Sequence, residues 1–583
     1  MSRARALFAV AMLAVLALAA AFRLPRLAQR PMHADEANQA VKSGRLYEKG
    51  TYEYDATDHH GPSLYWLTLP SLAISGAKDL AGSEEVAYRI VPVIFGLGLI
   101  PLLLLLADGL GRPAVVMAAL LTAISTAMVF YSRYYIQETL LVFFTFAALG
   151  CGWRYLRTRR LAWILAAGAA VGMMHATKET WILSAAAAVA ATALTWAWSR
   201  LCDSRPCMAF GGDTVGWAER APTGHHAHMV GGGRRVPPKR LLIHILAAAA
   251  TACLVAVALF SMFGKNWHGP WNSICAYTNY FRRGSQHGEH SEAWHYYLQL
   301  LFAYRPSKRI FWSEGFIAAL ALIGAAHALT QRSTAADTSQ TTRPVPSSPA
   351  LLRFLTFYTL LLTVLYSLIS YKTPWCALSF LMGMILLAGV GTAAVFRFLL
   401  ARSAGVTATS GSRWRFGLLS AAAAIGVVAG AGHLGWQAYQ LNFNPRYLAD
   451  ARNPYVYAHT PMPLPKLAAR LDRLAGQVPG GRDLPIHVVV TDNYWPLPWY
   501  LRRFNPERVG YWLDAKAWKQ DLDRIAPPAI LILSSDADSD DLASRLAGYN
   551  GPVYESLRPG VLIAVYVRKD LWPAYLEHIA ASD

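Results

Sequence analysis

Residues 7–22 read LFAVAMLAVLALAAAF, and the next polar motif is His33-Ala34-Asp35-Glu36. Arg3 and Arg5 precede the apolar run, which puts its N-terminus on the cytoplasmic side by the positive-inside rule. Small residues at its end resemble a cleaved signal peptide, but many apolar runs follow, so we predict an uncleaved anchor. The motif holds two carboxylates and an imidazole just outside the bilayer, a set suited to proton transfer. A simpler interpretation is that the two acids begin a helix, where a first turn favours them.

Long apolar runs recur up to about residue 440 and then stop. The 583-residue chain is 54% hydrophobic and 15% charged, with mean hydropathy +0.27, which is too apolar for an ordinary soluble protein. Its net charge of +19 indicates cytoplasmic loops that face anionic lipid, and we expect no nucleic-acid partner. We therefore predict a mainly α-helical, multi-pass protein of the cytoplasmic (inner) membrane, with a transmembrane domain at 1–440 and a soluble domain at 441–583.

The apolar runs predict about eleven transmembrane helices. They lie at about 7–22, 86–107, 113–131, 139–156, 161–175, 180–199, 241–263, 310–330, 351–370, 376–399 and 414–438. Arginine clusters then fall on the cytoplasmic side, with the N-terminus, while unusual polar clusters fall on the other side. These outer clusters are 33–36, 58–62, 133–138, 175–179, 282–295 and 371–375. We expect them to converge on one cavity.

The first outer loop, residues 23–85, is long for a connection and carries the Asp-Glu motif. Its apolar segment 63–74 is too short to span a bilayer, which takes about 20 residues, so we predict an interfacial or re-entrant helix.

The tail after residue 440 alternates strand-like and helix-like patterns. We predict strands at 486–490, 529–533, near 553 and at 561–567, and helices near 464–476, 538–548 and 570–580. This order predicts an α/β domain with a partly parallel sheet, outside the membrane. No glycine-rich loop follows its first strand, so a nucleotide site is unsupported. We expect the domain to contribute to acceptor selection.

The outer clusters combine groups that suit transfer of a lipid-linked sugar. A carboxylate accepts a hydroxyl proton, a cation binds phosphate, and an aromatic face suits a sugar ring. The catalytic candidates are Asp35, Glu36 and Glu138; the donor-phosphate candidates are Lys178, Lys372 and Arg133; the substrate-binding candidates are His33, His59, His60, Tyr371 and Trp375. For each lysine the competing interpretation is snorkelling to the interface.

Five motifs together resemble a known superfamily. They are His33-Ala-Asp-Glu36, Asp58-His-His-Gly-Pro62, Ser132-Arg-Tyr-Tyr-Ile-Gln-Glu138, Ala176-Thr-Lys-Glu179 and Tyr371-Lys-Thr-Pro-Trp375. The chain resembles GT-C membrane glycosyltransferases, the superfamily of protein O-mannosyltransferases and lipid A aminoarabinose transferases. It is most similar to a branch of flippase-activity-associated proteins that are linked to archaeal-type N-glycosylation genes.

The resemblance implies a polyprenyl-phosphate sugar donor and a role for Asp35 as the catalytic base. It implies a second acid after the third span, where related enzymes often have aspartate and this chain has Glu138. Some relatives bind a divalent metal through such acids and others work without one; Asp35, Glu36 and Glu138 offer oxygen ligands for Mg²⁺ or Mn²⁺.

The leading hypothesis is therefore an inverting glycosyltransferase that moves a hexosyl or pentosyl group from a polyprenyl phosphate. Its acceptor would be a glycan, lipid or protein at the outer face of the membrane. One alternative is a flippase or transport component, which would carry ionisable residues at mid-membrane and repeated halves. Another is a non-catalytic assembly partner whose tail binds an envelope component.

Overall fold

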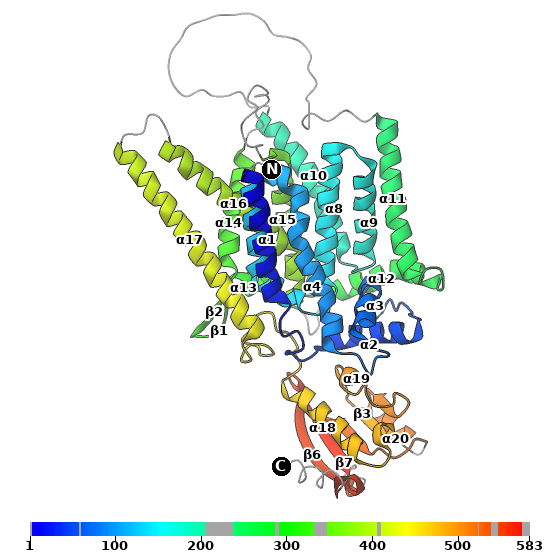
Figure 1. Cartoon of the computed structure of the whole chain (residues 1–583). Coiled ribbons are helices and arrows are strands. Elements are labelled where there is room, and N and C mark those ends of the chain that lie inside the picture. The colour runs from blue at the N-terminus through cyan, green and yellow to red at the C-terminus, as the bar shows by residue number, and fades with distance from the viewer. Residues whose placement is uncertain are drawn as a thin grey trace, which may run out of the picture.

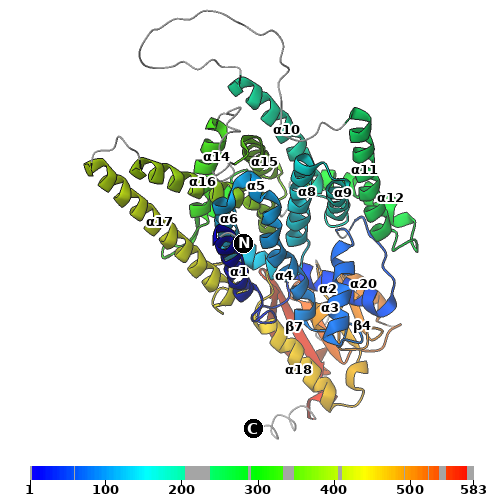
Figure 2. The same ribbon diagram turned by 45° about the horizontal axis from the view of Figure 1, so that its top comes forward.

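The computed structural model describes residues 3–57, 60–203, 237–285, 291–331, 347–404, 410–491, 493–522, 524–537 and 546–573. A bundle of long helices makes up most of the molecule, and a small domain built on a sheet lies beyond one end of it (Figure 1). The same arrangement is visible after a 45° rotation (Figure 2).

A helix occupies each of the predicted apolar runs, the third as a bent pair. The helices are α1 (Arg3–Arg23), α4 (Glu85–Leu102), α6 (Arg112–Ile124), α7 (Thr126–Ser132), α8 (Glu138–Thr158), α9 (Leu161–His175), α10 (Trp181–Asp203), α11 (Pro238–Phe260), α14 (Gly315–Thr330), α15 (Pro349–Leu368), α16 (Leu378–Ala404) and α17 (Ser410–Phe443). Within the described ranges, eight helices are long and apolar enough to cross a membrane, or nine if α6 and α7 count as one span. The apolar helices α9 and α14 are shorter than a usual span. The mainly helical, multi-pass fold is confirmed.

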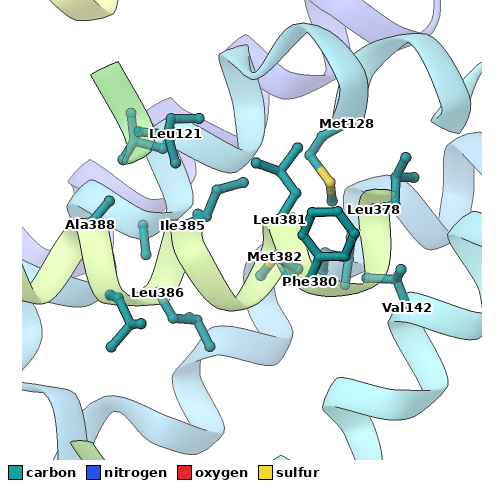
Figure 3. Close-up of a cluster of buried hydrophobic side chains, with 14 of the residues drawn as sticks. Leu121, Met128, Val142, Leu378, Phe380, Leu381, Met382, Ile385, Leu386 and Ala388 are labelled. Atoms are coloured by element: carbon teal, nitrogen blue, oxygen red, sulfur yellow. The ribbon is translucent and has the colours of Figure 1, made fainter. Parts of the chain in front are cut away.

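Helix α16 is the centre of the bundle. Its side chains Phe380, Leu381 and Ile385 are fully buried and pack with Leu121 of α6 and Met128 of α7 (Figure 3). The backbones of α14 and α16 are in direct contact. The approach is so close that a Cβ atom at Gly324 or Gly391 would collide with a carbonyl of the other helix. Small residues at such crossings let membrane helices approach closely.

The chain bends by 60° between α6 and α7. Ser125 lies at the break, and its side chain caps the N-terminus of α7. The Glu314 carboxylate accepts hydrogen bonds from Ser125 Oγ at 3.0 Å and from the Ala127 amide at 2.8 Å. These bonds satisfy polar groups that a continuous helix would pair internally, so they stabilise the bend.

The segments that carry the polar motifs lie at the end of the bundle that faces the sheet domain (Figure 1). They include α2 (Ala34–Lys49), α3 (Ser63–Ser75), α12 (His268–Ser285), α13 (Tyr296–Phe302), β1 (Tyr304–Ser307), β2 (Ile310–Trp312) and the 3₁₀ turn η2 (Pro374–Ala377). The short helix predicted at 63–74 is present as α3. The span predicted from residue 310 begins instead at Gly315, because residues 310–312 pair with β1.

The C-terminal domain has a five-stranded sheet of order β4-β3-β5-β7-β6. Its elements are α18 (Pro463–Gln477), β3 (Ile486–Val489), α19 (Leu497–Tyr500), β4 (Val509–Trp512), α20 (Ala515–Asp521), β5 (Ile530–Ser534), β6 (Tyr549–Arg558) and β7 (Val561–Arg568). β3 pairs parallel with β4 and β5, while β7 pairs antiparallel with β5 and β6. The partly parallel sheet is as predicted. Most of the helices predicted at 538–548 and 570–580 lies outside the described residues.

Candidate active site

The Asp-Glu motif begins helix α2, as the simpler interpretation of the sequence predicts. His33 is the N-cap: its Nδ1 accepts the Asp35 amide at 3.0 Å, and the Glu36 carboxylate accepts the His33 amide at 3.2 Å. This reciprocal capping box fixes the first turn of α2. The two acids nevertheless differ, because the Glu36 side chain is fully buried and the Asp35 side chain is 49% exposed.

Glu36 is held in a buried ion pair. Both of its carboxylate oxygens accept hydrogen bonds from Arg89, each at 2.8 Å, and Oε1 also accepts the Tyr135 amide at 2.9 Å. Burial alone would raise the pKa of Glu36, but the charges of Arg89 and Arg30 and these hydrogen bonds lower it to about 2. Its oxygens are therefore engaged with the protein, which leaves Asp35 as the carboxylate of the motif that can meet a substrate.

Arg89 also fixes the loop that leads to the motif. Its guanidinium donates to the carbonyls of Leu27, Arg30 and Pro31 at 2.7, 2.7 and 3.1 Å. Sequence reasoning missed this residue, although an arginine near the end of an apolar span is itself an indicator of a built site.

The motif at residues 371–375 meets the Asp-Glu motif through aromatic rings. The ring centroid of Trp375 is 6.1 Å from that of His33, 6.3 Å from that of Tyr134 and 5.8 Å from that of Tyr457. The structure thus brings together two predicted substrate-binding residues, His33 and Trp375. A small pocket lies beside His33, and the first outer loop, the end of α7 and the segment after α17 form its wall. The pocket is lined by Arg30, Pro31, His33, Phe130, Tyr134, Leu448, Ala449, Val456, Tyr457, His459 and Thr460.

Two other predicted residues, Glu138 and Lys178, form an ion pair. Glu138 begins α8, Lys178 follows α9, and both side chains are almost fully buried. The pair joins the third and fourth motifs.

The second motif packs on the fourth. His60 Nδ1 is 2.8 Å from Glu179 Oε2, and the Tyr54 hydroxyl donates to Glu179 Oε1 at 3.1 Å. Burial would raise the pKa of Glu179, but the neighbouring His60 brings it below its usual value. Glu179 lies in the fourth motif of the sequence, but its hydrogen bonds with His60 and Tyr54 are evident only from the structure. His59 lies outside the described residues.

Arg133 and Lys372 are bound to backbone carbonyls. Arg133 donates to the carbonyls that follow α1, at 2.9 Å to Arg23 and 2.7 Å to Pro25, and burial lowers its pKa to about 9. Lys372 donates to the carbonyls of Glu292 at 2.9 Å and of Ile369, and burial lowers its pKa. Tyr371 is exposed and forms a β-bridge with Ser291. Both cations therefore connect segments of the chain.

The three acids proposed as metal ligands do not form one metal site in this arrangement. Glu36 pairs with Arg89, and Glu138 pairs with Lys178, so each glutamate already faces a cation. In the part of the chain that the structure describes, no group of three or more His, Cys, Asp or Glu residues is arranged to hold a metal ion.

Comparisons with known proteins agree with this architecture. The family model for dolichyl-phosphate-mannose-protein mannosyltransferase matches residues 12–220. No curated protein sequence matches the chain. The structure of ArnT from Cupriavidus metallidurans bound to undecaprenyl phosphate superposes with a TM-score of 0.58 and 15% identity, over 96% of this chain and 97% of that one. The apo form of ArnT superposes with a TM-score of 0.57 and 16% identity, over the same shares of the two chains. The structure of the archaeal oligosaccharyltransferase AglB from Archaeoglobus fulgidus, in complex with an inhibitory peptide and a dolichol-phosphate, superposes with a TM-score of 0.48 and 13% identity. That match covers 98% of this chain and 77% of AglB. The chain therefore has the GT-C fold of ArnT.

Proposed function

We propose that the protein is an inverting glycosyltransferase that moves a sugar from a polyprenyl phosphate to an acceptor hydroxyl or amide at the outer face of the cytoplasmic membrane. The observation that carries the proposal is the contrast between the two acids of the first motif. Glu36 is buried and ion-paired, while its neighbour Asp35 is half-exposed at the start of a capped helix. The family match to mannosyltransferases and the ArnT-like fold support a lipid-phosphate donor.

The reaction is a single displacement at the anomeric carbon. Asp35 accepts the proton of the acceptor group as the acceptor forms its new bond to that carbon. The bond between the carbon and the phosphate oxygen breaks, and the lipid phosphate leaves as an anion. One displacement inverts the configuration. Trp375, Tyr134 and His33 form the aromatic wall beside this carboxylate and suit the sugar ring.

The outer side is assigned by charge. Arginines gather at the opposite end of the bundle from the motifs, at the ends of α8 (Arg154, Arg157) and α16 (Arg397, Arg402). By the positive-inside rule that end is cytoplasmic, so the motifs and the sheet domain face outward.

Lys178 is our candidate for the donor phosphate. Arg133 and Lys372 donate to backbone carbonyls, which favours a role in holding loops, whereas Lys178 lies in a side-chain pair with Glu138. We expect Lys178→Met to weaken binding of a polyprenyl phosphate by about ten- to a hundredfold, because a charge-assisted hydrogen bond contributes about 1.5–3 kcal/mol. Affinity is measured by titrating the lipid phosphate into protein in nanodiscs. Lys265→Met, at an exposed position after α11, removes the same charge and is the matched control. Equal affinities for the two variants would contradict this role.

A reconstituted assay separates transfer from transport. Purified protein in proteoliposomes receives a synthetic polyprenyl-phosphate sugar and a panel of acceptors, and both glycosylated product and lipid scrambling are followed. We expect product that depends on protein, with inverted anomeric configuration by NMR. Scrambling without product would favour the flippase alternative, and neither activity would favour the assembly partner.

A further inference from the structure

Met32, the residue before the Asp-Glu motif, forms hydrogen bonds through both its amide and its carbonyl with the C-terminal part of the chain. The Met32 amide donates to the Tyr500 hydroxyl at 2.8 Å, and the Thr460 hydroxyl donates to the Met32 carbonyl at 2.7 Å. Met32 is fully buried. Tyr500 ends helix α19 of the sheet domain, and Thr460 lies between α17 and α18, more than 400 residues along the chain.

The sheet domain makes further contacts with the same region of the bundle. Trp499 Nε1 donates to Glu85 at 3.2 Å, and its fully buried ring packs edge-on against Tyr88, with centroids 5.3 Å apart. Arg502 donates to the Ser83 carbonyl at 2.8 Å. Helix α19 therefore docks on the start of α4, the helix that carries Arg89, as well as on the loop before α2 (Figure 1).

These contacts act on the catalytic carboxylate through the capping box. Met32 is bonded directly to His33, whose Nδ1 accepts the Asp35 amide and whose own amide donates to Glu36. A movement of Met32 would therefore move the cap and the first turn of α2. Misplacement of a reacting group by about 1 Å is enough to cost about 10²-fold in rate.

We propose that Tyr500 and Thr460 are positioning residues that set the Asp35 carboxylate, so that the sheet domain is an integral part of the catalytic centre. The kinetic part of this proposal rests on the transferase function proposed above. Neither residue needs to touch the substrate. The same C-terminal segment also forms part of the pocket wall beside His33, through Tyr457, His459 and Thr460.

The test removes one hydroxyl at a time. Tyr500→Phe keeps the ring and deletes the bond to the Met32 amide, and we expect kcat to fall about tenfold while KM for the donor changes less than about twofold. Hydrogen exchange, followed on peptides that cover residues 27–36, should become faster because the Met32 amide loses its partner. Tyr549→Phe is the matched control, since its hydroxyl also makes a hydrogen bond to a backbone group, donating to the Pro528 carbonyl at 2.6 Å, but within the sheet domain.

Thr460 provides a second, independent variant. Thr460→Val should lower kcat and speed the same exchange, and Thr460→Ser, which restores the hydroxyl, should recover both. Unchanged exchange at residues 27–36 in Tyr500→Phe would overturn the proposal, as would faster exchange with an unaltered kcat. If the wild-type protein transfers no sugar, the proposed function fails, while the exchange data still decide whether the sheet domain holds this loop.

Discussion

Asp35→Asn is expected to lower the rate of sugar transfer by about 10²–10⁴-fold, the range that a general base contributes. The amide has the same shape as the carboxylate but cannot accept the acceptor's proton. The fold should persist, because the Asp35 side chain is half-exposed and the His33 cap of helix α2 accepts the Asp35 backbone amide, which the substitution keeps. Initial rates in proteoliposomes give the effect, and donor affinity should stay within about twofold of wild type.

Asp79→Asn is the control for this variant. It makes the same change in the same outer loop, at an exposed side chain that accepts the Gly82 amide at 2.7 Å. We expect wild-type rates. Should Asp35→Asn transfer sugar as fast as Asp79→Asn, the catalytic base must be sought elsewhere.

Arg89→Met is expected to give the largest loss of stability, about 3–5 kcal/mol, because it leaves the Glu36 carboxylate buried without its hydrogen-bonded partner and with only the more distant Arg30 at 3.6 Å. The effect should be read as a lower melting temperature in detergent. Glu36→Gln combined with Arg89→Met should recover part of the loss, since the double variant contains no uncompensated buried charge at this position. A melting temperature equal to that of wild type would show that the ion pair does not hold the loop.

The contribution of Glu36 to the pH dependence of stability should also weaken in this variant. In the wild type the pKa of Glu36 is lowered from 4.5 to about 2. The stabilisation that ionised Glu36 contributes is therefore complete above pH 4.5 and is lost as the pH falls towards 2. Without Arg89, burial, which raises the pKa of Glu36, is opposed only by Arg30 at 3.6 Å and by two amide hydrogen bonds, so this pKa rises from its low value. The loss of stability in Arg89→Met, relative to wild type, should therefore become smaller as the pH is lowered from 4.5 towards about 2. A constant difference between the two proteins over that range would count against this explanation.

Much of the fold was predictable because apolar length and charge asymmetry are properties of the sequence itself. A helix lies at each predicted run, and the motif-bearing loops gather at one end, as the sorting of arginines indicated. The bend at Ser125 was not predictable, since it depends on a carboxylate 189 residues away, Glu314. Strand β4 was missed because it is only four residues long and contains Gly510.

The roles within the site were harder to foresee than its location. Asp35 and Glu36 are adjacent and chemically alike, but successive residues on a helix point about 100° apart, so one faces Arg89 and the other faces solvent. Arg133 and Lys372 were predicted to bind phosphate from their charge. The sequence does not show that unpaired carbonyls, those after α1 and at the end of α15, lie within their reach.

Two arginines connect the end of α1 with α6 and α7. Arg133, which follows α7, donates to the carbonyls of Arg23 and Pro25, while Arg23, the last residue of α1, donates to Thr122 and Ala123 of α6 at 2.8 and 3.0 Å. Both arginines thus hold the junction between α1 and the loop that leads to Asp35. A change in the tilt of α1 would therefore be transmitted to that loop, which couples the position of the Asp-Glu motif to the packing of the first helix.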